Sequence, residues 1–177
     1  MKALLKSLRG HSPQVHPTAF VAETAVLIGQ VQVGEGSSIW YNTVLRGDVN
    51  AIRVGARSNI QDGAVVHCTY QHTETHIGDE VTIGHLAMIH GCTIHSHVLV
   101  GMSCTVLDQA VIEPDVILGA GSLVLQRQVL ESGHLYAGSP ARKLRKLSEE
   151  QMKSIRHYAT QYQMYTDWYL SEPNIGS

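Results

Sequence analysis

Residues 77–94 read IGDEVTIGHLAMIHGCTI, in which isoleucine recurs every six residues with one step of five. The same spacing of six runs along most of the chain, with a slip of three residues after Leu45 and a longer break after Val66. All eighteen positions of the series are aliphatic: Val15, Val21, Leu27, Val33, Ile39, Leu45, Val54, Ile60, Val66, Ile77, Ile83, Ile89, Ile94, Val100, Val106, Ile112, Leu118 and Val124. Two residues before most of them stands a small or β-branched residue. A period of two inside a period of six indicates very short strands, each with one large and one small inward side chain.

The period of six also predicts how the chain coils. Three such units make one triangular coil of about eighteen residues, so that strands of successive coils stack in parallel. This pattern resembles the hexapeptide-repeat proteins with a left-handed parallel β-helix, and the left hand, which opposes the usual crossover rule, is implied by that resemblance. An ordinary β-sandwich is the competing interpretation. We predict a mainly β fold, with a left-handed parallel β-helix of hexapeptide repeats over residues 1–146, including a short N-terminal lead and a closing turn.

A different pattern begins after the repeats end at Val124. Glycines and Pro140 mark a turn that leads to the basic stretch 142–146. Ser148 and Gln151 have the spacing of a capping box at the start of a helix. Side chains at steps of three and four then form a mainly aromatic stripe: Met152, Ile155, Tyr158, Tyr162, Tyr165 and Tyr169. We expect a C-terminal α-helix over residues 147–172, whose stripe packs along a flat face of its own or a neighbouring β-helix.

The composition limits the classes of function. Lys and Arg number 13 against 15 Asp and Glu in 177 residues, and the net charge is -2, which argues against a nucleic-acid partner. The apolar runs in the sequence are too short to predict a membrane span or a signal peptide. The three cysteines suggest no disulfide framework and indicate a reducing compartment, the cytoplasm by default. Cys92 and Cys104 fall at small inward positions and are expected in the core. Cys68, beside His67, could lie near a metal site, but as a fourth protein ligand it would close that site.

The register of the repeats brings some of the 11 histidines together. If residues 67–76 form a loop excursion, Val66 and Ile89 lie on the same face of adjacent coils. His67 and His90 follow these inward residues and therefore point outward as a stacked pair. His85 lies at the corner of the preceding face, from which a single chain would struggle to bring it to the other two, and a neighbouring subunit could supply it. Three histidines with one open position are typical of a catalytic zinc site; a solvated histidine pair is the alternative.

Polar residues cluster before these histidines in the sequence. The two segments are Arg46-Gly47-Asp48 and Asn59-Ile60-Gln61-Asp62-Gly63. A repeat protein does not usually carry such a cluster of charged and amide side chains at these positions. Gln61 follows an inward isoleucine and is expected to face outward. Arg46 is a candidate to pair with Asp62 across an interface between subunits.

These motifs, with Ile83-Gly84-His85 and His90-Gly91-Cys92, resemble the signature of the gamma-class carbonic anhydrases in order and spacing, over roughly residues 10–145. The resemblance implies a homotrimer with metal sites between subunits and a hydro-lyase that converts carbon dioxide to bicarbonate by metal-bound hydroxide. It implies zinc as the metal, with iron or cobalt as alternatives. The implied metal ligands are His67, His85 and His90; Gln61 and Asn59 orient the substrate or hydroxide, and Arg46, Asp48 and Asp62 lock the interface.

The sequence departs from this family at the residues that move protons. Active members carry glutamates in two loops, whereas here Val49 follows the Arg-Gly-Asp segment and Glu74 is the sole acid between Cys68 and His76. We therefore expect weak activity, with His72 or His76 as substitute proton carriers and Tyr136 near the site. The alternatives are a coenzyme A-linked acyltransferase or thioesterase on the same coil, and a metal-stabilised trimeric binding or scaffold protein.

Overall fold

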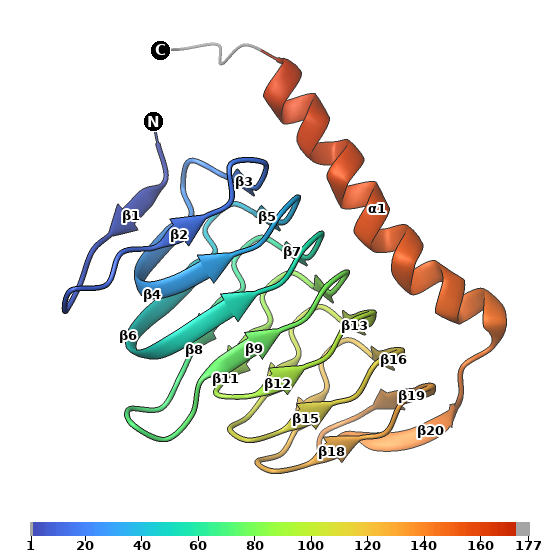
Figure 1. Ribbon diagram of the computed structural model, residues 1–177. Helices are drawn as coiled ribbons and strands as arrows, with labels where there is room; N and C mark the ends of the chain where they lie inside the picture. The colour runs from blue at the N-terminus through green and yellow to red at the C-terminus, as the bar shows by residue number, and fades with distance from the viewer. Residues whose placement is uncertain (1, 173–177) are drawn as a thin grey trace.

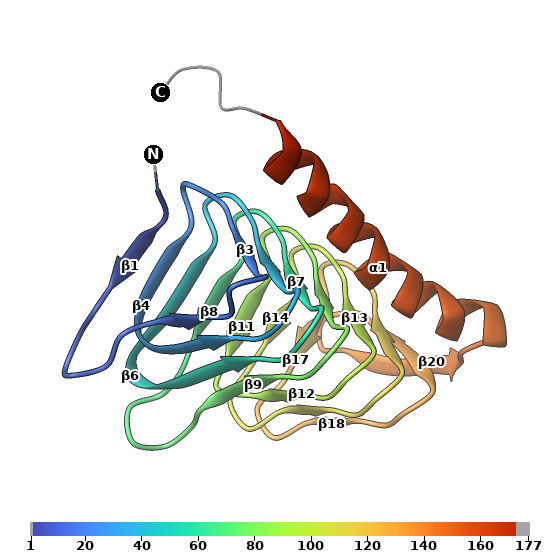
Figure 2. The same cartoon turned by 45° about the horizontal axis from the view of Figure 1, so that its top comes forward.

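The computed structural model describes residues 2–172, which form a parallel β-helix of about seven turns and one C-terminal helix (Figure 1). This confirms the predicted mainly β fold, which matches the left-handed β-helix of hexapeptide repeats. The coil has three flat faces, and the helix lies along one of them (Figure 2).

Face one contains the strands that are followed by the paired histidines. Its members are β1 (Leu4–Lys6), the first halves of β4 (Val26–Val33) and β6 (Val44–Val54), β8 (Val65–His67), β11 (Met88–His90), β14 (Thr105–Val106) and β17 (Leu123–Val124). Face two contains β2 (Gln14–Val15), the second halves of β4 and β6, β9 (Thr75–Ile77), β12 (Thr93–Ile94), β15 (Val111–Ile112) and β18 (Val129–Leu130). Both long strands turn the corner between these faces without a break in β-structure.

Face three lies beneath the helix. It contains β3 (Phe20–Val21), β5 (Ser38–Ile39), β7 (Asn59–Ile60), β10 (Thr82–Ile83), β13 (Val98–Val100), β16 (Val116–Leu118), β19 (His134–Ala137) and β20 (Arg142–Lys146). The pairing is parallel throughout except at β20, which runs antiparallel to β19 and closes the sheet. Basic side chains on this final exposed strand oppose further edge-to-edge pairing.

The aliphatic series forms the core, as the spacing predicts. Sixteen of its eighteen members are buried, and only Val15 and Val21, on the first coil, are partly exposed. Val66 pairs in register with Ile89, and His67 with His90, so the residues between Cys68 and Thr75 do form a loop excursion. We call residues 68–74 the excursion loop.

Glycines at the corners serve mainly for close approach between coils. A Cβ on Gly84 would stand 2.6 Å from the backbone nitrogen of Met102 on the next coil, a distance that real Cβ atoms do not show. The left-handed backbone conformation is instead often adopted by other residues, such as Arg57, Glu80 and His97, with φ of 53° to 59°. Close approach of the backbones, rather than a positive φ, is thus the more general reason for glycine at these corners.

The C-terminal helix α1 (Glu149–Ser171) begins with the predicted capping box, because Ser148 and Gln151 bond each other's backbone N–H groups. Ile155 and Ala159 are buried against the β-helix. Trp40 anchors the far end of α1, with ring centroids 5.4 Å from Tyr162 and 5.2 Å from Tyr169. The aromatic stripe therefore packs on face three. Among residues 2–172, no helix combines the length and apolar character that crossing a membrane requires.

The cysteines lie in the core, and one of them provides a test of the inward positions. Burial raises the pKa of the Cys92 thiol to about 12, so it stays protonated at neutral pH. We expect Cys92→Ser to lower the free energy of unfolding by about 1–3 kcal/mol, because a more strongly polar hydroxyl replaces a thiol in a dry core. Urea unfolding measures this loss. Metal content of the folded variant should be unchanged; loss of metal without loss of stability would place Cys92 at the site instead.

Candidate metal centre

Two imidazole rings stand in contact at the end of face one. His67 ends β8 and His90 ends β11, and the ladder between these strands places them side by side. His67 Nδ1 lies 3.1 Å from His90 Nε2, and the ring centroids are 5.1 Å apart. Both side chains are partly buried, with 16% and 26% exposed. The outward histidine pair that the register predicts is therefore present.

A carboxylate contacts the opposite nitrogen of each ring. Asp48 Oδ1 lies 3.0 Å from His67 Nε2, and both oxygens of Asp108 lie 3.2 Å from His90 Nδ1. An ionised carboxylate can only accept hydrogen bonds, so each of these ring nitrogens must donate. In the neutral imidazoles, the two nitrogens that face each other then both present lone pairs.

This arrangement fits a metal ion. Zinc holds imidazole nitrogens at about 2.0–2.1 Å in tetrahedral geometry, which sets two such nitrogens about 3.3 Å apart, close to the separation of His67 Nδ1 and His90 Nε2. Two lone pairs this close repel unless a proton or a cation lies between them. Burial lowers the pKa of His67, which favours the neutral form that a ligand requires. The donor set and its carboxylate partners are those of a histidine metal site.

His85 lies at the other edge of face one. It sits in the corner between β10 and β11, five residues before His90, and its Nδ1 is 3.0 Å from Asp62 Oδ2. His85 stands before β11 and His90 ends this strand, so the two histidines lie at opposite ends of one face. No group of three His, Cys, Asp or Glu side chains within residues 2–172 is arranged to hold an ion. The three histidines therefore do not meet within the described part of one chain, and a site shared between subunits stays a prediction. We call the pair of His67 and His90, and His85 with its neighbours, the two half-sites of that predicted site.

The predicted amides belong to the His85 half-site. Gln61 Oε1 accepts the backbone N–H of His85 at 3.2 Å, and Gln61 Nε2 donates to Asn59 Oδ1 at 3.1 Å. Asn59 in turn donates to Thr82 Oγ1 at 2.9 Å. Gln61 points out of the coil as predicted, yet it is only 5% exposed, in the groove between face three and α1. These bonds fix both amides beside His85.

Within one chain Arg46 pairs with Asp48, whereas the sequence predicts a pair with Asp62 across an interface between subunits. Its guanidinium lies 2.6 Å from Asp48 Oδ2, while Asp62 contacts His85. Burial alone would raise the pKa of Asp48, but hydrogen bonds from Arg46 and His67 together hold it below its usual value. Asp48 therefore stays ionised at neutral pH and keeps His67 oriented. The predicted contact between Arg46 and Asp62 of another subunit stays a prediction.

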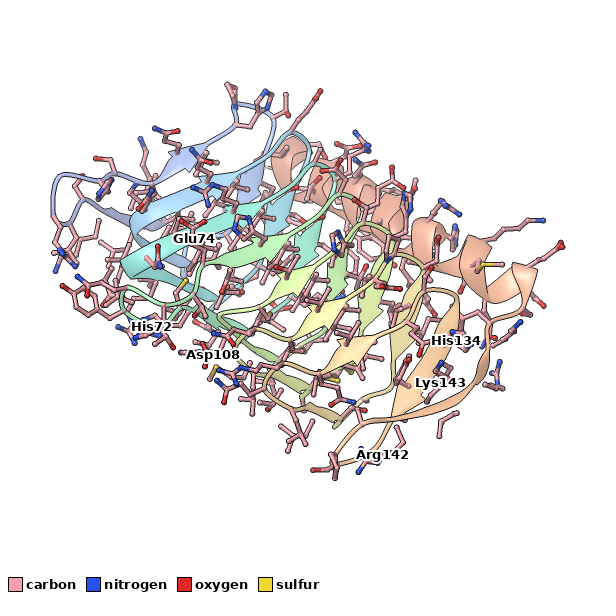
Figure 3. All side chains as sticks on the ribbon, turned by 60° about the horizontal axis from the view of Figure 1, so that its bottom comes forward. His72, Glu74, Asp108, His134, Arg142 and Lys143 are labelled. Carbon is pink, nitrogen blue, oxygen red and sulfur yellow. The ribbon has the colours of Figure 1, made fainter. Side chains whose placement is uncertain are left out.

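Other candidates lie apart from the histidine pair within one chain. Tyr136 occupies an inward position beside Leu118 in the core, where its hydroxyl accepts the Glu131 N–H at 2.9 Å. Glu74 contacts Arg53 and lies 3.0 Å from His76 Nε2 on face two. Figure 3 shows Glu74 apart from Asp108. Neither Tyr136 nor the pair of Glu74 and His76 therefore joins His67 and His90.

Cys68 and His72 come from the excursion loop. The Cys68 thiol is buried in the core and donates to the Ala51 carbonyl at 3.2 Å. The His72 backbone N–H donates to the Thr69 carbonyl at 3.1 Å, in the turn of the loop. Figure 3 shows His72 on the same side of the coil as Asp108. A role for His72 in moving protons stays a prediction.

The sequence interpretation missed Asp108 and two threonines. Asp108 Oδ1 accepts hydrogen bonds from Thr69 Oγ1 and Thr73 Oγ1, both at 2.8 Å. Burial alone would raise the pKa of Asp108, but these bonds and His90 hold it low. The register of the repeats could have pointed to Asp108. Asp108 follows Val106 by two residues, and Gly91, which stands directly after His90, follows Ile89 by two residues on the adjacent coil. The threonines left no periodic signal, because they lie outside the repeats.

Face one also presents an apolar ladder outside the coil. The outward side chains in register across its strands are Leu4, Val26, Val44, Val65, Met88, Thr105 and Leu123. Exposed Leu86, Met102 and Leu125 extend this surface at the corners. We call these residues the apolar ladder. It lies between the two half-sites.

Comparisons with known proteins find curated relatives named as gamma carbonic anhydrases and solved structures of hexapeptide-repeat proteins. No protein-family model matches the sequence. The chain is 47% identical over 156 residues to Gamma carbonic anhydrase 1, mitochondrial, of Arabidopsis thaliana, covering 85% of this chain and 57% of that protein. It is 49% identical over 142 residues to a Methanocaldococcus jannaschii protein named "Probable carbonic anhydrase", covering 80% and 89%. A solved structure of a hexapeptide transferase family protein from Anaplasma phagocytophilum superposes with a TM-score of 0.90 at 44% identity, covering 94% and 98%.

Proposed function

The chain belongs to the gamma carbonic anhydrase family of hexapeptide-repeat proteins, and on that premise we propose that it is a metal-dependent hydro-lyase that converts carbon dioxide and water to bicarbonate and a proton. One observation supports this above all. His67 Nδ1 and His90 Nε2 face each other at 3.1 Å while carboxylates hold both opposite nitrogens. Such a pair has the geometry of two ligands on one ion.

The proposal includes a homotrimer in which His85 of one chain completes the site of the next. Two facts support it: His85 lies one face away from the pair, and the apolar ladder lies between the half-sites. An exposed apolar surface of this length is typical of an interface. In a closed ring each chain gives one half-site to each neighbour, so three equivalent sites form. Zinc is the metal we propose, with iron or cobalt as alternatives.

Each residue of the proposed site would then have a separate role in binding the ion or orienting the substrate. His67 and His90 hold the ion from one subunit, and Asp48 and Asp108 keep their rings oriented. A bound divalent ion would lower the pKa of a coordinated water toward neutrality. Gln61, fixed beside His85 by Asn59, would orient water or carbon dioxide with its amide. Arg46, Asp48 and Asp62 lie at the proposed interface, where charge pairs fix the relative orientation of subunits.

Proton release is where this chain departs from its family. Hydration leaves one proton at the site for each bicarbonate formed, and it must reach the buffer. Val49 packs against the core and cannot accept a proton, and Glu74 is bound to Arg53 and His76 on face two. We therefore expect a low rate that rises with the concentration of an imidazole-type buffer.

Elemental analysis of untagged protein, purified without chelator, tests the proposal. We expect about one zinc or iron per chain, measurable carbon dioxide hydration, and loss of both after chelation. A protein that remains unable to take up added zinc would contradict the proposal and favour acyl transfer, which needs no metal. The related Anaplasma protein carries the transferase name. Metal-loaded protein without hydration activity would instead indicate a structural role for the ion.

A further inference from the structure

Asp108 joins the excursion loop to His90. Its Oδ1 accepts from the hydroxyls of Thr69 and Thr73 at 2.8 Å, and both its oxygens lie 3.2 Å from His90 Nδ1. The backbone N–H of Thr69 donates to Thr73 Oγ1 at 3.1 Å, which ties the two ends of the loop to each other. The carboxylate therefore receives hydrogen bonds from the loop on one side and from the imidazole on the other.

Gly91 makes room for this contact. Its φ is +56°, and a Cβ there would stand 2.1 Å from Asp108 Oδ1 and 2.2 Å from Thr73 Oγ1. A side chain directly after His90 would therefore displace both the carboxylate and the loop hydroxyl. Thr73 is only 7% exposed, so it has little room to move. Three segments that are distant in sequence thus meet at one carboxylate.

We infer that Asp108, fixed by Thr69 and Thr73, is a positioning residue that selects the His90 tautomer with its proton on Nδ1. The two threonine hydroxyls must both donate to Oδ1, because that oxygen has no hydrogen to give. His90 Nδ1 then donates to the same carboxylate, and its Nε2 lone pair points toward His67 Nδ1. The inference rests on the proposed metal site. It adds that the excursion loop determines the affinity of the site for its ion. The loop does so through Asp108, because its threonine hydroxyls bond this carboxylate and not the imidazoles.

Asp108→Asn tests this role with little change of shape. The threonine hydroxyls keep the amide oxygen at the Oδ1 position, so the amide NH₂ takes the place of Oδ2, 3.2 Å from His90 Nδ1, and can donate to that nitrogen. This hydrogen bond favours the His90 tautomer with its proton on Nε2, where it blocks the metal. We expect zinc affinity, measured by competition with a chromogenic chelator, to fall about 10- to 100-fold. Asp115→Asn is the matched control, because Asp115 pairs with Arg156 and His97 at another corner; its zinc affinity should equal the parent's.

Nitrogen NMR of histidine-labelled, metal-free protein gives a readout that a merely structural role would not change. We expect the proton of His90 on Nδ1 in the parent and on Nε2 in Asp108→Asn. Thr69→Val, which removes one hydroxyl donor, should weaken zinc binding by a smaller factor. Zinc affinity of Asp108→Asn within twofold of the parent, or the same tautomer in both proteins, would overturn the inference. A parent that binds no zinc would refute the proposed function, while the tautomers of the metal-free proteins would still decide this inference.

Discussion

Mixed trimers of His85→Ala and His67→Ala chains should recover about one quarter of the parent's metal and hydration activity, although each variant alone has almost none. A site in the mixture is complete when the chain that gives His67 and His90 is the first variant and the chain that gives His85 is the second. With equal amounts and random assembly in a closed ring, each condition holds for half of the sites. Elemental analysis and hydration rates of co-refolded chains measure the recovery.

The controls for this mixing experiment use the same chain. His95→Ala removes an exposed histidine away from both half-sites and should leave metal content unchanged. His85→Ala alone should keep its oligomeric state in sedimentation, because the apolar ladder does not depend on the metal. If mixed oligomers form and no metal returns, the three ligands do not come from two chains, and the shared site is wrong.

Much of the fold could be predicted because the same constraint recurs. Every aliphatic residue of the series meets one requirement, an inward place in a stack of coils, so a single error of register cannot persist along the chain. The pairing of Val66 with Ile89 follows from counting coils, and the pairing of His67 with His90 follows from it. The half-site separation follows as well, since His85 precedes His90 by one face.

What could not be predicted depends on side-chain direction at the corners. Arg46 and Asp48 lie two residues apart, and only the bend inside β6 shows that they meet each other within one chain. Tyr136 is polar at its tip, yet it occupies an inward position because its hydroxyl reaches the Glu131 N–H at the closing turn. Asp108 was missed because its partners Thr69 and Thr73 belong to the excursion loop, whose path no period fixes.

Gly91→Ala should be far more damaging than Gly121→Ala, although both glycines have a left-handed backbone, with φ of +56° and +68°. Gly121 has open space, with nothing within 4 Å of an added Cβ, so its substitution measures the backbone strain alone, about 1–2 kcal/mol. At Gly91 the added Cβ also collides with Asp108 and Thr73, and we expect a further loss of about 1–3 kcal/mol. Urea unfolding of both variants gives the difference.

The same pair of variants separates the fold from the metal site. Displacing Asp108 releases Nδ1 of His90, so Gly91→Ala should bind zinc more weakly even at temperatures where it is fully folded, whereas Gly121→Ala should bind it like the parent. Equal zinc affinity in the two folded variants would mean that the carboxylate can shift without affecting His90. A lower zinc affinity for Gly91→Ala alone would mean that the absence of a Cβ at residue 91 is needed to hold His90 in its metal-binding orientation.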